Sequence, residues 1–142
     1  MLNVIAKAAQ TVAVNQNVIF TNTRVKSRRC ACASGWLNHD DGSGLFEVTN
    51  RGNLPMAVEV DFNANVSAAA AGATALTLEL NGEAIGGTEM DYTVVTAEVY
   101  QNVKASTLIA IPSGSSFTVS VGNISATSVL VKDANIIIKK LA

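Results

Sequence analysis

The chain has 142 residues, of which 49% are hydrophobic, 15% are charged and 5% are aromatic, and its formal net charge is −1. This near-neutral charge provides no general attraction to nucleic acid or to an anionic membrane. No apolar run approaches the ~20 residues that a membrane-spanning helix needs. Because charges are so few, much of the surface must be neutral or covered by partners.

The first ten residues are expected to form an N-terminal arm or a first strand. Asn3 and Lys7 interrupt this segment, so it lacks the apolar core of a signal peptide, and the chain is expected to be made in the cytosol. An arm would expose the apolar side chains of Leu2, Val4 and Ile5, and it could become ordered on binding. These three residues are therefore the predicted attachment site on a larger assembly.

From residue 11 onward the hydrophobic pattern has a period of two, which predicts strands. Turn signals rich in glycine, asparagine and proline separate them. The predicted strands are, in chain order, Thr11–Phe20, Arg29–Leu37, Gly44–Thr49, Met56–Val66, Leu76–Asn81, a return strand from Glu83, Thr93–Val99, Val103–Ile111, Ser116–Val121, Ser128–Val131 and Asn135–Leu141.

The dipeptide Asn81-Gly82 is the strongest turn signal in the chain. It supplies the positive φ angles that a tight hairpin turn requires. It follows Leu80, the last apolar residue of an alternating segment, and precedes Glu83. A two-residue hairpin is therefore predicted here.

The last strand differs from the others because it is apolar on both faces. Successive side chains of a strand point to opposite faces, so Ile136 and Ile138 can fill a core while Ile137 and Leu141 need a second dry surface. Other copies of the same chain are the simplest source of such a surface. The strand, with Ile136, Ile137, Ile138 and Leu141, is the predicted subunit interface.

About ten short strands without a convincing helix describe an all-β sandwich or barrel. No internal repeat and no proline- or glycine-rich linker divides the sequence. Residues 11–142 are therefore expected to form one domain.

The two cysteines, Cys30 and Cys32, are separated by one residue. Side chains at positions i and i+2 of a strand lie too far apart for an unstrained disulfide. Two free thiols in a reducing compartment are the expected state, and an intersubunit disulfide formed after release is the alternative.

The search for catalytic chemistry centres on His39, the only histidine, which precedes Asp40 and Asp41. This loop has too few ligands for a calcium or transition-metal site and does not match the EF-hand spacing. Ser43 has no base oriented by a third group, so no catalytic triad is implied. We therefore predict no catalytic residue, metal or cofactor, and we regard His39, Asp40 and Asp41 as a candidate outward binding loop.

Several motifs, in this order, resemble small C1q/TNF-like jelly-roll proteins that bacteriophages and prophages encode. The resemblance spans nearly the whole chain. The segments that carry it are Ala9–Asn15, Val18–Phe20, His39 with Gly42–Gly44, Phe62–Val66, Leu80–Glu83, Glu98–Val103, Ile111–Gly114 and Val131–Ile137.

The resemblance implies a jelly roll of about ten strands that forms a tight homotrimer, with the first and last strands near the threefold axis. It further implies a non-enzymatic virion protein, made in the host cytoplasm, that decorates a phage capsid, binds the major capsid protein and stabilises the capsid surface. The alternative is the receptor- or glycan-binding head of a phage fibre, with a host-surface glycan as partner of the loops at residues 38–44 or 67–74. A sugar-processing enzyme is the least favoured hypothesis, because aromatic platforms for sugars are scarce.

Overall fold

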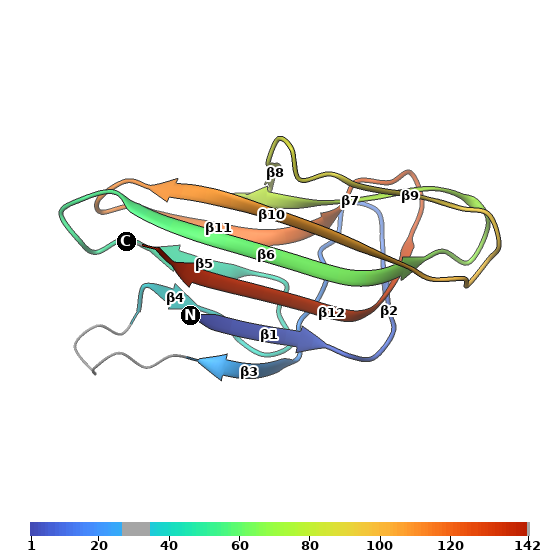
Figure 1. Ribbon diagram of the computed structural model, residues 1–142, viewed down its shortest axis with the longest axis horizontal. Coiled ribbons are helices and arrows are strands. Elements are labelled where there is room, and N and C mark those ends of the chain that lie inside the picture. Colours follow the sequence, from blue (N-terminus) through green and yellow to red (C-terminus); the bar gives the residue numbers. More distant parts are fainter. Residues whose placement is uncertain (27–34, 142) are drawn as a thin grey trace.

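The computed structural model describes residues 1–26 and 35–141, and it is a sandwich of two antiparallel sheets with six strands each (Figure 1). In these described ranges all regular elements are strands, and no helix is long and apolar enough to cross a membrane. The prediction of an all-β sandwich is confirmed.

Sheet A contains both ends of the described chain, and β12 lies in its middle. Its strands are, in spatial order, β10 (Gln101–Ile111), β6 (Met56–Ser67), β12 (Val129–Lys140), β1 (Leu2–Ala6) and β3 (Asn22–Lys26), while β2 (Gln10–Val12) pairs with β12. Strands β1 and β2 share the edge of β12 that faces away from β6. The last strand is therefore covered on both edges.

Sheet B contains shorter strands from the middle of the chain. They are, in spatial order, β4 (Leu37–Asn38), β5 (Phe46–Thr49), β11 (Ser116–Asn123), β7 (Gly72–Leu80) and β8 (Glu83–Ala84), while β9 (Met90–Val94) pairs with the other end of β7. The predicted hairpin turn is confirmed: Asn81 and Gly82 have φ angles of 52° and 81°, and Leu80 pairs with Glu83.

The alternation of the sequence determines which side chains enter the core. In β6 every apolar residue from Met56 to Val66 at even positions is buried, and the polar residues between them are partly exposed. Three phenylalanines occupy the centre: the ring of Phe20 lies edge-on to Phe46 at 5.3 Å and to Phe62 at 6.2 Å between centroids. Such edge-to-face pairs contribute beyond the area that they bury.

Two predicted strands end earlier than expected because the backbone turns. Strand β2 ends at Val12, since the chain turns at Asn15, where φ is 63°. The amide of Val18 then donates to the carbonyl of Val121, so this segment crosses from sheet A to sheet B. Strand β9 ends at Val94, and Glu98 in the following loop has a φ of 61°.

The N-terminal residues form β1 and do not form an arm. Leu2 and Val4 are 3% and 0% exposed, and they belong to the core between the sheets. Their assignment as attachment residues is therefore wrong, because a side chain in the folded core cannot contact a partner. The predicted strand Arg29–Leu37 lies mostly outside the described residues, as do Cys30 and Cys32.

Candidate functional site

The outer face of sheet A, which points away from sheet B, collects side chains from five strands. The pairing registers place them in two rows across the sheet. One row consists of Ser106, Asp61, Ile137, Asn3 and Val25, and the next consists of Lys104, Asn63, Asn135, Ile5 and Asn22. Ile137 thus lies between an acidic and an amide side chain, and this face is mainly polar.

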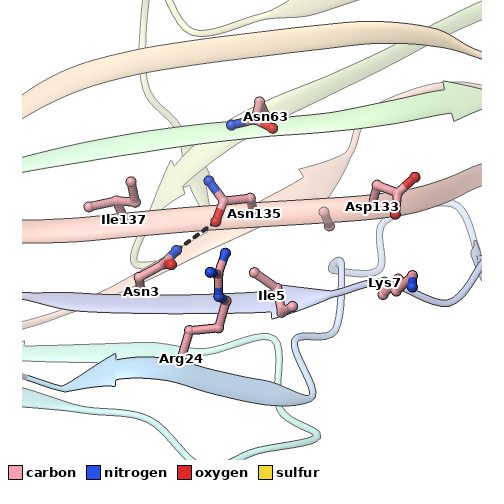
Figure 2. Close-up of a pocket in the computed structure, with 9 residues that line it drawn as sticks. Asn3, Ile5, Lys7, Arg24, Asn63, Asp133, Asn135 and Ile137 are labelled. Atoms are coloured by element: carbon pink, nitrogen blue, oxygen red, sulfur yellow. Dashed lines mark hydrogen bonds between the residues drawn. The ribbon is translucent and has the colours of Figure 1, made fainter.

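A groove of about 410 Å³ lies in this face across β6, β12, β1 and β3 (Figure 2). Amides, two cations, one carboxylate and a few apolar side chains line it. The lining residues are Asn3, Ile5, Lys7, Arg24, Asn63, Asp133, Ala134, Asn135 and Ile137, which we call the amide groove.

A β-bulge in β12 forms one end of the amide groove. Lys132 pairs with Asn65 and Asn135 pairs with Asn63, so Asp133 and Ala134 together lie opposite a single residue of β6. Asp133 has a φ of 49°, a conformation that residues other than glycine rarely adopt. Bulges redirect side chains and are over-represented beside functional sites.

A second bulge, in β3, brings Arg24 to the groove. Asn3 pairs with Val25 and Val4 pairs with Thr23, so Arg24 is the extra residue without an opposite partner. Figure 2 shows its guanidinium directed between β1 and β12, toward Asn135. The bulges in β12 and β3 therefore place the Asp133 carboxylate and the Arg24 guanidinium at the edge of the amide groove.

Hydrogen bonds hold some side chains of the amide groove in place, whereas other side chains of the groove lack such a partner. The Asn3 side-chain amide donates to Asn135 Oδ1 at 2.6 Å and to the Ile136 carbonyl at 3.0 Å. Asn65 Nδ2 donates to Asp133 Oδ2 at 3.4 Å. Among residues 1–26 and 35–141, Arg24 and Lys7 form no ion pair, so the groove holds two cations against one carboxylate.

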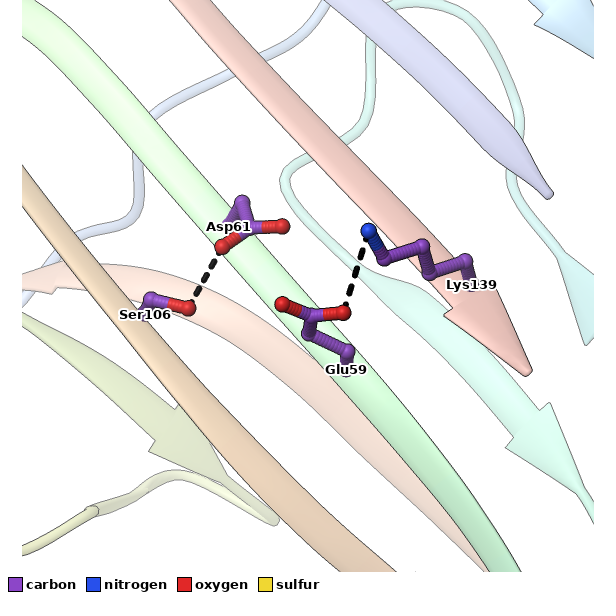
Figure 3. A network of polar contacts seen from close by, with 4 residues as sticks. All are labelled: Glu59, Asp61, Ser106 and Lys139. Atoms are coloured by element: carbon purple, nitrogen blue, oxygen red, sulfur yellow. Dashed lines mark hydrogen bonds and ion pairs between the residues drawn. The ribbon is translucent and has the colours of Figure 1, made fainter. Parts of the chain in front are cut away.

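The other half of the outer face carries charged side chains that already have polar partners (Figure 3). Lys139 Nζ lies 3.1 Å from Glu59 Oε2, and the Ser106 hydroxyl donates to Asp61. The hydrogen bond to Glu59, with the attraction of its charge, raises the pKa of Lys139. Leu108, on the neighbouring strand, is 67% exposed. We call this region, formed by the outward residues of β10, β6 and the C-terminal end of β12, the contact half.

The predicted interface residues separate onto two sides of β12. Ile136 and Ile138 are fully buried between the sheets, so their assignment to a subunit interface is wrong. Ile137 is half-buried on the outer face, and Leu141 is 50% exposed just beyond the strand. Ile137 faces away from the core as predicted, but Asn135 and Lys139 flank it, so the outer side of β12 is only partly apolar.

The predicted outward loop is partly occupied by its own contacts. The His39 ring stacks on Phe46, with 4.1 Å between centroids and 9° between planes. Its Nδ1 lies 2.9 Å from the Leu45 carbonyl, which can only accept, so Nδ1 carries the proton. Asp41 accepts a hydrogen bond from Thr23. Within the described ranges, no cluster of three or more His, Cys, Asp or Glu side chains could hold a metal ion.

Sequence reasoning missed the amide groove. The alternation of the sequence identifies Asn63 and Asn135 as outward-facing strand residues. Nothing in the local sequence indicates that they lie opposite each other on neighbouring strands. Arg24 and Asp133 reach the groove only because of bulges, and no turn residue such as glycine marks either position.

No protein-family model matches the sequence, and no curated protein is significantly similar to it. Two solved structures superimpose over nearly the whole chain. The globular domain of zebrafish complement 1qA protein has a TM-score of 0.59 and 13% identity, with 96% of this chain and 94% of that chain covered. Murine APRIL has a TM-score of 0.55 and 8% identity, with 95% of each chain covered. This chain therefore has the C1q/TNF-type jelly-roll fold.

Proposed function

We propose that this chain is a non-enzymatic structural protein of a bacteriophage virion. It forms a homotrimer and decorates the capsid surface, where it binds the major capsid protein after synthesis in the host cytoplasm. The observation that carries the proposal is the placement of β12 in the middle of sheet A with Ile137 on the outer face, where β10 also exposes Leu108. A protein that binds only the assembled capsid stabilises it by its binding free energy at each site.

The contact half is the proposed subunit interface. Glu59 is paired with Lys139 and Asp61 accepts a hydrogen bond from Ser106, so covering the Glu59–Lys139 pair costs less than covering two unpaired charges. Leu108 supplies apolar area next to them. A stable interface buries about 800 Å² per partner, and in a cyclic trimer the contact half would face a different, complementary surface of the neighbouring subunit.

The molar mass in solution tests the trimer. Closed cyclic assembly of three 14.7 kDa chains gives about 44 kDa, which light scattering coupled to gel filtration measures directly. We expect one species near this value across a tenfold range of concentration. A stable monomer would contradict the trimer and remove the support for the contact half.

Attachment to the capsid is proposed at the end of the sandwich that holds both termini. There the C-terminus lies beside the connection between β5 and β6 (Figure 1), and Leu141 N donates to the Ala57 carbonyl. Leu54, in that connection, is 77% exposed and Leu141 is 50% exposed. These side chains take the place of Leu2 and Val4 in the attachment hypothesis.

Incorporation into particles tests this attachment end. The variant Leu54→Asp with Leu141→Asp removes its apolar groups. Val95→Asp is the control, because Val95 is 82% exposed and directly follows β9, which Figure 1 shows toward the opposite end of the sandwich. Gradient-purified virus particles from the encoding host should contain the control at the wild-type level and at least about tenfold less of the double variant. Equal incorporation of both variants would contradict attachment at this end, and absence of the wild-type chain from the particles would contradict the virion proposal.

The second candidate function is a receptor- or glycan-binding head of a phage fibre. The amide groove favours it, because unpaired cations and open amides suit a polar ligand more than an apolar subunit contact. The predicted loop is a weaker site, since the His39 ring packs on Phe46. Binding of a glycan by the purified chain would support this candidate whether or not the chain also decorates a capsid.

A further inference from the structure

We propose that the connection between β5 and β6, residues 50–55, is a preformed docking loop whose partner is an apolar pocket rimmed by carboxylates on the capsid protein. This inference rests on the proposed attachment at the terminal end of the sandwich, and it names the chemistry of the surface recognised there. The docking loop lies at that end (Figure 1) and not on the outer face of sheet A, so the proposed subunit interface leaves it uncovered.

The side chain of Asn50 holds the backbone of the docking loop in one conformation. It is buried, and its Nδ2 donates to the carbonyls of Leu54 at 2.8 Å and Ile111 at 2.9 Å. Its Oδ1 accepts from the amide of Gly52 at 2.9 Å. The Ser113 hydroxyl donates to the Gly52 carbonyl at 2.6 Å, which ties the loop to the turn between β10 and β11. A loop fixed in this way loses little conformational entropy when it binds.

The fixed loop presents an apolar side chain to solvent. Leu54 is largely exposed, although the hydrogen bond from Asn50 holds its backbone. The exposed Leu141 is held in a similar way, because its amide donates to the carbonyl of Ala57, just beyond the loop. Exposed apolar side chains on a rigid backbone mark a contact site when they gather at one place. The surface that receives them must therefore be apolar where the leucines enter.

Cations without a counter-charge accompany the two leucines. Arg51 and Lys140 are exposed, and neither forms an ion pair within residues 1–26 and 35–141. Lys140 alternates with the outward Lys139, so it does not belong to the outer face of sheet A. No Asp or Glu occurs in residues 50–55, in residues 112–115 or after β12. Carboxylates on the partner would pair with these cations across the contact.

Sheet B carries charge of the opposite sign. All charged residues in its strands are acidic, namely Glu47, Glu79, Glu83 and Asp91. An acidic partner surface would repel this sheet and attract the terminal end. The separation of charge within the chain therefore favours approach with the docking loop first.

A protein surface fits this end better than nucleic acid or a membrane does. Nucleic acid would pair with Arg51 and Lys140 through phosphates but would leave Leu54 and Leu141 without an apolar partner. Electrostatic attraction to an anionic membrane uses clusters of about four to eight cations, more than the described residues of this end provide.

Cosedimentation of the purified chain with capsids assembled without it tests the proposal. We expect the wild type to bind, and the bound fraction to fall as salt rises. Arg51→Gln with Lys140→Gln should weaken binding at least about tenfold, as expected for the loss of two charge-assisted hydrogen bonds. Arg51→Lys with Lys140→Arg should keep most of the binding, because both charges remain.

The matched control is Val95→Asp with Ala97→Glu, which changes the net charge by the same amount at two exposed positions after β9, toward the opposite end of the sandwich. It should bind like the wild type. Wild-type binding by the Arg51→Gln, Lys140→Gln variant, or binding that does not depend on salt, would overturn the acidic partner but not the attachment end, which the leucine variant tests separately.

Two further outcomes would also overturn the proposal. Loss of binding after nuclease treatment of the capsids would identify nucleic acid as the partner. Equally strong binding to phosphatidylserine vesicles would show a general attraction to anionic surfaces. A wild-type chain that does not bind capsids at all would contradict capsid decoration itself, and the docking loop would fall with it.

Discussion

Phe20→Ala is expected to lower the free energy of unfolding by about 3–5 kcal/mol, the usual cost of removing a buried phenylalanine ring. The Phe20 side chain is 0% exposed and lies against Phe46 and Phe62, one from each sheet. Its loss leaves a cavity at the only described place where three aromatic rings join the two sheets. Chemical denaturation followed by circular dichroism, at a fixed protein concentration, measures the change.

Phe117→Ala is the matched control for Phe20→Ala. The Phe117 ring is only partly buried and packs at the margin of the core, so its removal should cost clearly less. Phe20→Leu, which keeps most of the volume, should also cost less than alanine. Equal losses for Phe20→Ala and Phe117→Ala would contradict the aromatic cluster as the centre of the core.

Neighbouring substitutions in β12 are expected to have opposite consequences. Ile136→Lys places an unpaired charge at a position that is 0% exposed between the sheets, so the chain should not fold. Ile137→Lys places the charge on the outer face, directly opposite Asp61, where it can be neutralised. The second variant should fold, but its molar mass should drop from about 44 kDa to the 14.7 kDa of one chain.

Circular dichroism and light scattering separate these outcomes. Ile136→Val, which removes one methylene, should cost only about 0.5–1.5 kcal/mol and keep the trimer, which shows that position 136 tolerates apolar change. A folded Ile136→Lys would contradict the assignment of this side chain to the core. A trimeric Ile137→Lys would exclude Ile137 from the subunit contact and move the proposed interface to other residues of the face.

The regular strands were predictable because their chemistry is local. Residues 56–66 alternate without interruption, and β6 covers Met56–Ser67 with the even positions inward. Asn81-Gly82 forms the expected turn, since its positive φ angles are a property of the dipeptide itself. The period of two also identified Ile137 as a residue that faces away from the core.

Other features depend on contacts between distant segments. The sequence of residues 1–10 is compatible with either an arm or a strand. Only the pairing of β1 with both β12 and β3 places Leu2 and Val4 in the buried core. The predicted strands at 128–131 and 135–141 are one strand, because hydrogen bonding to β6 continues on both sides of the bulge at Asp133.

The sequence by itself determined the fold class and the inward side of each long strand, because side-chain alternation follows directly from backbone geometry. Tertiary structure alone decided which strands are neighbours, and therefore which outward residues form a surface. Asn3, Asn63 and Asn135 are far apart in the sequence and meet only because β1 and β6 pair with opposite edges of β12. Arg24 joins them because a bulge, which depends on pairing between strands, turns it toward the groove.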